Sequence, residues 1–198
     1  EITTRLVGSE MCIRDRYDYI AFLDADDIWE SDYLECQKKL IGTYPDAGIY
    51  STAFYSLEKG KRKLRNVLIN EHIHFLVHDY FKESVMNGLS ICWTSSLCLK
   101  KEVIKEIPMF RVGIKRGEDL DLWLRIALNY DVAYLNLPKV FYRTGLSDSL
   151  TSDYSKNGEF PYYEWFNFTS ESSYYRKYVI LVVYIHCLLY TSPSPRDA

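Results

Sequence analysis

The stretch Tyr19-Ile-Ala-Phe-Leu-Asp-Ala-Asp-Asp-Ile-Trp29 decides how the rest of the chain is interpreted. Its first five residues are apolar or aromatic and include neither Gly nor Pro, which is typical of a short buried strand. The apolar run stops at three carboxylates, Asp24, Asp26 and Asp27. Because side chains alternate faces along a strand, we expect Asp24 and Asp26 to point the same way. The stretch therefore predicts a strand with acids at its carboxyl end.

Paired carboxylates of this kind favour a divalent cation. A small number of oxygen ligands suits Mg²⁺ or Mn²⁺, which are completed by water and by substrate phosphates. Open α/β sheets bind their ligands at the carboxyl ends of strands. The pattern thus indicates a site for a metal and a diphosphate. An acidic loop that caps the following helix is the alternative that these residues leave open.

Length and composition limit the classes of protein. With 198 residues, of which 47% are hydrophobic, the chain suits one domain with a sizeable core. The net charge is −3, and the one dense run of cations, Lys59 to Arg65, is interpreted as a solvated hairpin tip and not as a nucleic-acid surface. Eighteen Tyr and four Trp agree with a sugar-binding surface, although such residues also fill cores.

Cysteine spacing and hydropathy bear on the compartment. The five cysteines form neither a metal-type CxxC pair nor an even disulfide framework, which favours reduced thiols in the cytoplasm. These are Cys12, Cys36, Cys92, Cys98 and Cys187. The longest apolar run, residues 178–190, is shorter than the roughly 20 residues of a spanning helix. We expect a cytoplasmic protein, with peripheral association at the inner face of the membrane as an alternative.

The remaining pattern predicts alternating helices and strands. Ser31 is the expected cap of a first helix that Tyr44-Pro45 ends. Three histidines near residues 72–78 are interpreted as exposed residues of a helix and not as metal ligands. The expected elements are a helix at 31–44, strands at 47–57 and 63–68 joined by a turn at 58–61, a helix at 71–85, a strand at 89–99 with Thr94, Ser95 and Ser96 at a cleft, a short helix at 100–107, strands at 131–136 and 139–143, a polar loop at 145–157 and an aromatic-rich helix from 160.

A second acidic group begins the stretch Gly117-Glu-Asp-Leu-Asp-Leu-Trp-Leu-Arg125. Apolar residues recur here at helical spacing, so Glu118 and Asp119 fall at the amino end of a helix. Acids in a first turn are stabilised by the helix dipole, and capping alone would explain them. If this group meets the first one, the first can hold a metal while the second supplies a base.

The two stretches together resemble the family 2 glycosyltransferases of GT-A fold. The resemblance rests on Leu23 to Trp29, on Tyr33-Leu34-Glu35, on Gly117 to Arg125, and on Pro138 with Tyr142-Arg143, and it covers about residues 17–149. It implies an α/β fold: a partial GT-A, Rossmann-like mixed sheet flanked by helices that lacks its N-terminal nucleotide-binding strands.

The resemblance also implies roles for individual residues. Asp26 would coordinate Mn²⁺ or Mg²⁺ under the diphosphate, with Asp24 contributing to that site and holding the ribose or sugar end of the donor. Asp27 would support them. Asp119 would be the general base that deprotonates the acceptor hydroxyl, and Glu118 would shape the acceptor pocket. Trp123 would line the acceptor site, although its helical spacing favours a core position.

The implied reaction is a single, inverting sugar transfer from a nucleotide-diphosphate sugar, UDP-sugar above all, to a saccharide or lipid-linked acceptor. No Gln-x-x-Arg-Trp motif of processive polymer synthases is present. A His that often follows the Tyr-Arg pair is also missing, because Thr144-Gly145 stand there. That departure removes one expected metal ligand.

The ends of the chain depart from the family as well. Residues 5–16 and 188–198 resemble translated sequencing-adapter sequence, and no Pro-Thr-Tyr-Asn-like nucleobase turn precedes Tyr17. We therefore expect non-native segments at 1–16 and 188–198, a GT-A core fragment at 17–150 and an aromatic helical segment at 151–187. The fragment is expected to bind nucleotide sugar weakly and to be inactive alone.

Two other functions fit parts of the pattern. A haloacid-dehalogenase-like phosphatase also has a hydrophobic strand ending in DxD, with Asp24 as nucleophile and Asp26 as acid. It usually has a small pair such as Gly-Thr after that motif, where this chain has Asp27-Ile28, and a convincing Ser/Thr and Lys pair is absent. A non-catalytic sugar-binding remnant is the third interpretation.

Overall fold

The structure is a computed structural model that describes residues 17–87, 90–114, 117–145 and 173–191, with side chains of the last segment described to residue 182. Its elements, in chain order, are β1 (Tyr19–Ala21), β2 (Ile28–Trp29), α2 (Tyr33–Thr43), β3 (Ile49–Glu58), β4 (Lys61–Arg65), β5 (His74–Val77), α3 (Tyr80–Met86), the 3₁₀ turn η1 (Thr94–Ser96), β6 (Leu97–Lys100), α4 (Val103–Glu106), α5 (Glu118–Ala127), β7 (Val132–Thr144) and α7 (Ser173–Thr191). They form the mixed α/β fold that the sequence predicts.

One mixed sheet organises these elements. Its strands run in the order β1-β6-β3-β7-β2, with β4 paired to β3 and β5 paired to β7. The two long central strands, β3 and β7, are parallel, and every other pairing is antiparallel. This arrangement brings the end of β1, the start of β6 and the end of β7 to the same region of the molecule, although they are far apart in sequence.

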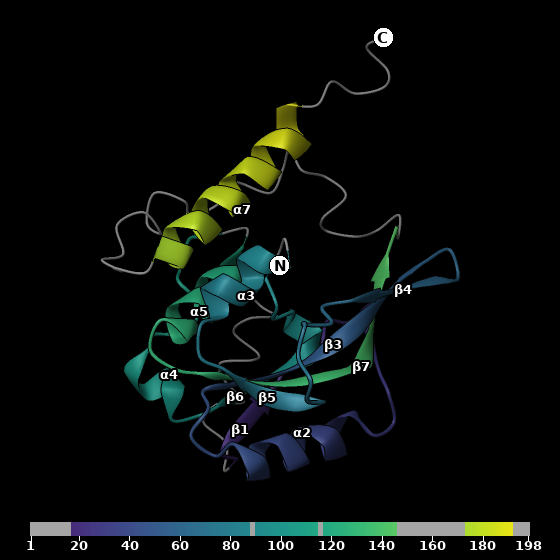
Figure 1. Ribbon diagram of the computed structural model, residues 1–198, viewed down its shortest axis with the longest axis vertical. Helices are drawn as coiled ribbons and strands as arrows, with labels where there is room; N and C mark the ends of the chain where they lie inside the picture. The colour runs from purple at the N-terminus through teal and green to yellow at the C-terminus, as the bar shows by residue number, and fades with distance from the viewer. Residues whose placement is uncertain (1–16, 88–89, 115–116, 146–172, 192–198) are drawn as a thin grey trace.

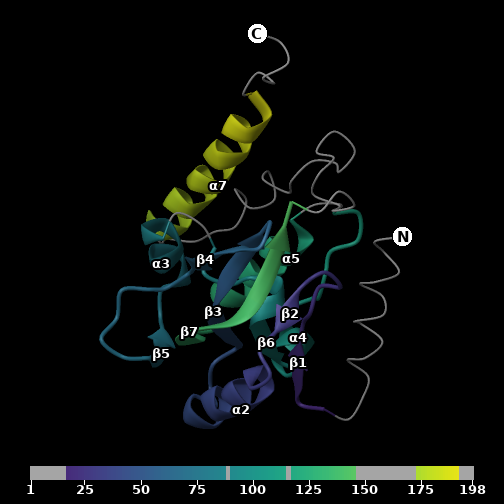
Figure 2. The same ribbon diagram turned by 90° about the vertical axis from the view of Figure 1, so that its right-hand side faces the viewer.

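Helices cover both faces of the sheet. In Figures 1 and 2, α2 lies below the sheet, while α3, α5 and α7 lie above it. The larger core cluster lies between the sheet and the upper helices and includes Trp123, Tyr134 and Tyr178, and a smaller one lies between the sheet and α2 around Tyr50 and Leu40. The sheet is therefore buried on both sides, which explains the long run of buried residues in β3.

The β3–β4 hairpin is confirmed. Lys59 and Gly60 both have positive φ, 47° and 77°, at the two-residue turn. Such a turn matches the twist of the strands that it joins, and Gly adopts its conformation without steric cost. In Figure 1 the hairpin extends beyond the body of the sheet. The cationic run is thus a solvated hairpin, as its composition indicates.

Three sequence-based expectations are wrong. Residues 71–85 are not one helix, because β5 pairs with β7 before α3 begins at Tyr80. The strands expected at 131–136 and 139–143 are one strand, β7. Pro138 interrupts nothing because it lies at a register shift opposite Ala53 in β3, where the ladder is already irregular. Helix α2 is capped at Asp32 and not at Ser31.

Several expectations concern segments outside the described residues. These are the N-terminal segment 1–16, most of the polar loop and the start of the aromatic segment. Helix α7 accounts for the later part of that segment and runs to Thr191, past the boundary expected at residue 188. Cys36, Cys92 and Cys98 are free thiols. Among the described residues, no helix is long and apolar enough to cross a membrane.

Candidate functional site

The first acidic group lies in the loop between β1 and β2. Strand β1 ends at Ala21, three residues before Asp24, and Asp27 N donates to Asp24 O at 3.0 Å. The acids therefore occupy a tight turn and not the strand itself. The strand alternation that we expected to align Asp24 with Asp26 does not apply to them.

The short 3₁₀ turn η1, which consists of hydroxyl residues, is hydrogen-bonded to this loop. Asp24 N donates to Ser95 Oγ at 3.0 Å, and Trp29 Nε1 donates to Ser95 O at 2.7 Å. Ser95 is fully buried, so these bonds fix both sides of the acidic loop to one point of the core. Of the hydroxyl residues expected on a strand at a cleft, Thr94 and Ser95 contact the acids, but they belong to a 3₁₀ turn, and Ser96 is buried and bonds to Trp93 O instead.

Asp27 is the buried member of the group. It is 7% exposed, and its Oδ1 accepts the N–H of Arg143 at 3.1 Å. Its Oδ2 forms no hydrogen bond with any described residue. Burial raises the pKa of Asp27, and the nearby Ser95 hydroxyl and Arg143 N–H oppose that shift. Because a buried carboxylate oxygen without a partner is costly, this atom is a natural acceptor for a cation or a donor group.

Arg143 closes the other side of the loop. Besides the N–H contact with Asp27, its Nε donates to the carbonyl oxygen of Asp26. The end of β7 therefore positions a guanidinium beside the carboxylates. Sequence reasoning noted the Tyr142-Arg143 pair but assigned it no role, since only the sheet topology brings β7 to the acidic loop.

The second acidic group begins α5. Gly117, at the N-cap, has φ 72°, a left-handed conformation that Gly adopts readily. Asp119 Oδ2 accepts from Thr94 Oγ1 at 2.8 Å, and Asp119 Oδ1 accepts from Leu120 N at 2.7 Å. Thr94 and Ser95 are consecutive residues of η1. One turn of chain thus holds Asp119 on one side and the backbone of Asp24 on the other.

Electrostatics confirm that the two groups lie close together. The pKa of Asp24 is raised to about 7, first by desolvation and then by repulsion from four carboxylates. Those carboxylates are Asp27, Asp119, Asp26 and Glu118, in decreasing order of effect. Desolvation, followed by the charge of Asp119, also raises the pKa of Glu118. The structure therefore brings Asp24, Asp26, Asp27, Glu118 and Asp119 into one electronegative site.

Trp123 does not belong to that site. It is fully buried and packs edge-to-face on Phe22 and Phe110, with ring centroids at 5.4 and 6.4 Å. Its side chain fills the core, which is the position that its helical spacing favours. A side chain with no exposed surface cannot line a substrate pocket.

The acidic residues of this site suit one mode of cation binding and not another. No group of three or more His, Cys, Asp or Glu side chains in the described residues is arranged to hold a metal ion. An ion held by protein ligands alone is therefore not built into this loop. Mg²⁺ bound through one or two carboxylates and substrate phosphates needs no such group, and the crowded Asp24 carboxyl suits that mode.

Comparisons with known proteins bear on the fold. No protein-family model matches the chain, and no curated protein matches it in sequence. The mixed sheet with its flanking helices nevertheless resembles the fold of solved structures.

Two of the solved structures that this fold resembles are of TarS from S. aureus. A crystal structure of TarS 1-349 has a TM-score of 0.63 at 11% identity and covers 92% of this chain and 50% of that one. A second TarS crystal structure has a TM-score of 0.54 at 14% identity and covers 72% and 24%. This chain therefore spans half or less of the length of these neighbours.

Proposed function

We propose that the chain is the diphosphate-binding and acceptor-activating part of a family 2 glycosyltransferase. The observation that carries the proposal is the convergence of Asp24 and Asp119 on the two sides of η1. The reaction would transfer one sugar from a nucleotide-diphosphate sugar, with UDP-sugar as the preferred donor, to a hydroxyl of a saccharide or lipid-linked acceptor. A lipid-linked acceptor would bring this cytoplasmic protein to the inner face of the membrane.

Asp119 would act as the general base. Its Oδ2 is held by the Thr94 hydroxyl, so the carboxylate has a fixed orientation at the start of α5. An acceptor hydroxyl at hydrogen-bond distance would lose its proton to Asp119 as its oxygen attacks the anomeric carbon. Attack from the side opposite the leaving diphosphate inverts the configuration. Glu118 would contact the acceptor beside Asp119.

The acidic loop would hold the donor. Asp26, with Asp24, would bind Mn²⁺ or Mg²⁺ together with the phosphates, and Asp24 would also contact the ribose or the sugar. When bound, such an ion neutralises the charge that develops on the leaving diphosphate. Asp27 supports the loop through its contact with Arg143 N. The guanidinium of Arg143 would add a second positive charge beside the phosphates.

Turnover of the whole protein tests the proposal. Asp119→Asn should lower kcat for UDP release from UDP-sugar about 10²–10⁴-fold, the usual contribution of a general base, with KM for the donor little changed. Glu35→Gln is the matched control, because it makes the same change in an exposed acid of α2. An Asp119→Asn protein with the kcat of the wild type would contradict the proposal.

Binding to the chain itself is a second test. Calorimetric titration of residues 17–186 with UDP-sugar and Mn²⁺ should give weak binding, because these residues contain no Pro-Thr-Tyr-Asn-like turn of the kind expected to hold the nucleobase. Micromolar affinity would contradict that expectation. The phosphatase alternative has its own readout: hydrolysis of p-nitrophenyl phosphate that Asp24→Asn abolishes would favour it.

A further inference from the structure

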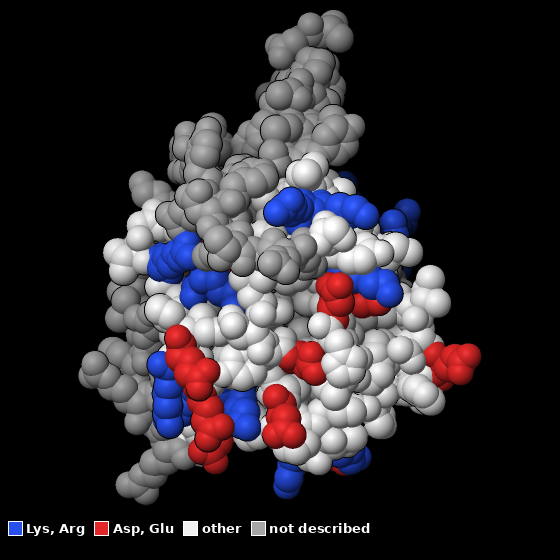
Figure 3. Space-filling view, turned by 60° about the vertical axis from the view of Figure 1, so that its left-hand side comes forward, with Lys and Arg blue, Asp and Glu red and all other residues white. Residues whose placement is uncertain are grey.

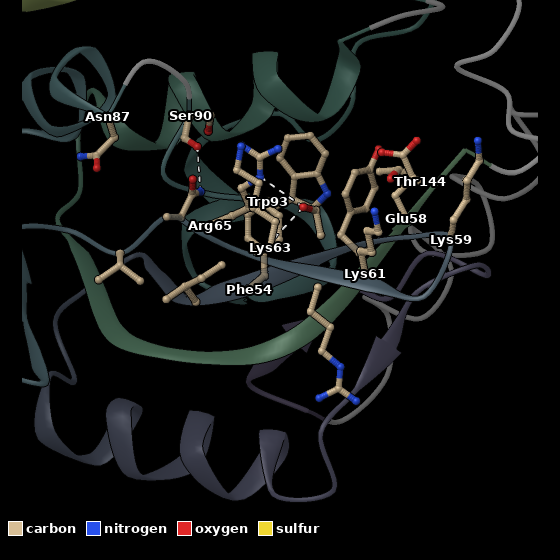
Figure 4. A pocket seen from close by; sticks show the side chains of 16 residues that line it. Phe54, Glu58, Lys59, Lys61, Lys63, Arg65, Asn87, Ser90, Trp93 and Thr144 are labelled. Atoms are coloured by element: carbon tan, nitrogen blue, oxygen red, sulfur yellow. Dashed lines mark hydrogen bonds between the residues drawn. The ribbon is translucent and has the colours of Figure 1, made fainter.

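A second feature of the molecule is a cavity of about 1030 Å³ along the β3–β4 hairpin. Figure 4 shows its lining, with Trp93 and Phe54 in the middle, Lys61 and Lys59 toward one end, and Ser90 and Asn87 at the other. None of these residues belongs to the two acidic groups. The cavity therefore needs an explanation of its own.

Strand register determines which side chains share this cavity. Phe54, Ser56 and Glu58 alternate along β3 and so point to one face of the sheet. Their partners in β4 are Arg65, Lys63 and Lys61, and Ser56 and Glu58 also pair with Tyr142 and Thr144 of β7. Three strands thus place cations at the outer strand and an aromatic ring at the inner one, all on the same face.

The inner wall of the cavity is an aromatic cluster. Trp93 lies edge-on to Tyr142 with ring centroids 4.7 Å apart, and Phe54 lies 5.5 Å from Trp93. Trp93 and Tyr142 are both partly exposed, while Phe54 is buried behind them. Exposed ring surface of this kind covers the apolar face of a sugar ring, as the high Tyr and Trp content first indicated.

The outer wall is strongly basic. Lys59, Lys61, Lys63 and Arg65 are all exposed, and within the described part of the chain none of them forms an ion pair. Glu58 is the one acid among the described residues that line the cavity. The face in Figure 3 differs, since acidic and basic side chains are intermixed on it. The charge of the cavity is thus a local feature in a chain whose net charge is −3.

The cavity is joined to the acidic site through two pairs of neighbouring residues. Trp93 directly precedes Thr94, whose hydroxyl holds Asp119. Tyr142 directly precedes Arg143, which contacts Asp26 and Asp27. The turn and the strand that carry the two rings therefore also carry the residues that hold the acidic site.

We propose that this cavity binds the acceptor and that the acceptor is an anionic saccharide. Its ring would lie against Trp93 and Tyr142, and its carboxylate or phosphate groups would meet Lys61, Lys63 and Arg65. Opposite charges across a cleft raise both the encounter rate and the selectivity for such a ligand. The identification of this ligand as the acceptor rests on the proposed function. Its binding does not, because no turnover is needed to measure it.

Calorimetric binding of matched oligosaccharides to the chain tests the proposal. The probes are trigalacturonate for carboxylates, maltotriose 6-phosphate for a phosphate, and unmodified maltotriose as the neutral counterpart, each at 50 mM and 300 mM NaCl. At least one anionic probe should bind tenfold or more tightly than maltotriose, and the higher salt should reduce that difference. Which anionic probe binds better would identify the acidic group.

Charge-reversal variants locate the binding. Lys63→Glu and Arg65→Glu should each lower the affinity for the anionic probe at least tenfold, and Trp93→Ala should weaken all three saccharides. Lys38→Glu is the matched control, because it reverses one exposed cation on α2, on the other side of the sheet, and should change affinity less than twofold. Trp93→Ala can affect folding. Lys63 and Arg65 are exposed hairpin residues, so the affinities of Lys63→Glu and Arg65→Glu decide where the saccharide binds.

Three outcomes would overturn the proposal. Equal affinity for neutral and anionic probes would remove the role of charge. An unchanged affinity in Lys63→Glu would move the binding to another surface. Tighter binding of a single-stranded oligonucleotide than of either anionic saccharide would identify a different ligand. Failure in any of these leaves the Asp119→Asn turnover test untouched, so the two proposals can fail separately.

Discussion

The first turn of α5 carries two acids, Asp119 and Asp121, that sequence alone does not distinguish, and the structure gives them different roles. Asp119, in the first turn, bonds to the Thr94 hydroxyl and adds to the negative field at Asp24. Asp121, two residues on, is fully buried and accepts from Arg125 Nε at 2.9 Å. Arg125 in turn donates to the carbonyl oxygens of Pro108 and Met109.

This difference shows how one short motif can anchor a helix and furnish a reactive group. The buried Asp121–Arg125 pair ties α5 to the loop at residues 108–109, and Trp123 packs the same part of the helix into the core. The amino end is thereby held in place while its own acids stay partly open. Stability and chemistry should therefore respond separately to substitutions only two residues apart.

The largest expected effect is on stability and comes from Asp121. Replacing it by Ala leaves Arg125, which is 7% exposed, without its carboxylate. Breaking a buried pair in this way costs about 3–5 kcal/mol in the free energy of unfolding. Urea unfolding followed by circular dichroism measures it. A loss below about 1 kcal/mol would mean that the pair does not anchor α5.

Thr94 should have a smaller effect. Thr94→Val keeps the shape of the side chain but removes the hydroxyl that donates to Asp119. We expect a loss of about 0.5–1.5 kcal/mol in the same unfolding experiment, the usual net contribution of one hydrogen bond. Turnover should also fall, because Asp119 loses its fixed orientation. Thr43→Val, which removes a hydroxyl that bonds to the backbone of α2, is the control and should leave turnover unchanged.

Asp119→Asn should change stability least. The substitution removes a favourable interaction with the helix dipole, about 0.3–1 kcal/mol, and it also removes repulsion of Glu118 and Asp24. These effects oppose each other, so the net change should be below about 1 kcal/mol. A large loss of stability would give Asp119 the anchoring role that we assign to Asp121.

The pH dependence of stability should reveal Asp24. Its pKa in the folded chain is raised from 3.8 to about 7, so folding favours the protonated form. The folded state is therefore stabilised at low pH, and that contribution is lost as pH rises through about 7. Thermal unfolding should show that Asp24→Asn gains melting temperature over the wild type at pH 8, and that this gain is smaller at pH 5. An equal shift at both pH values would contradict the raised pKa.

Much of the fold follows from local sequence. The β3–β4 hairpin, α2 and α5 were predictable because Lys59-Gly60 specifies a tight turn and the helices have clear apolar faces. Residues 71–77 were misread because β5 is defined by its pairing with β7, a contact that local periodicity does not show. The break in β7 that we expected at Pro138 was wrong for a related reason. The pairing of β3 with β7 is irregular opposite Pro138, and this irregularity shows only in the strand register.

The candidate site was predictable as two acidic groups but not as an arrangement. In the sequence, Asp24 follows an apolar run, and Asp119 stands at the start of an apolar helical pattern. It could not show that η1 lies between them, because the contacts of Ser95 and Thr94 span 71 and 25 residues. The same limit applied to Arg143, which reaches Asp26 and Asp27 across 117 and 116 residues. Trp123 was ambiguous because a helical aromatic residue suits either core or cleft.

Titration of the Asp24 carboxyl by ¹³C NMR tests the central claim most directly, because that claim is that the two acidic groups share one site. In the wild-type chain this carboxyl should titrate with a pKa of about 7, and Asp119→Asn should lower that value by removing one of the charges that raise it. A pKa near the ordinary value for aspartate, or a raised value that Asp119→Asn leaves unchanged, would contradict the shared site.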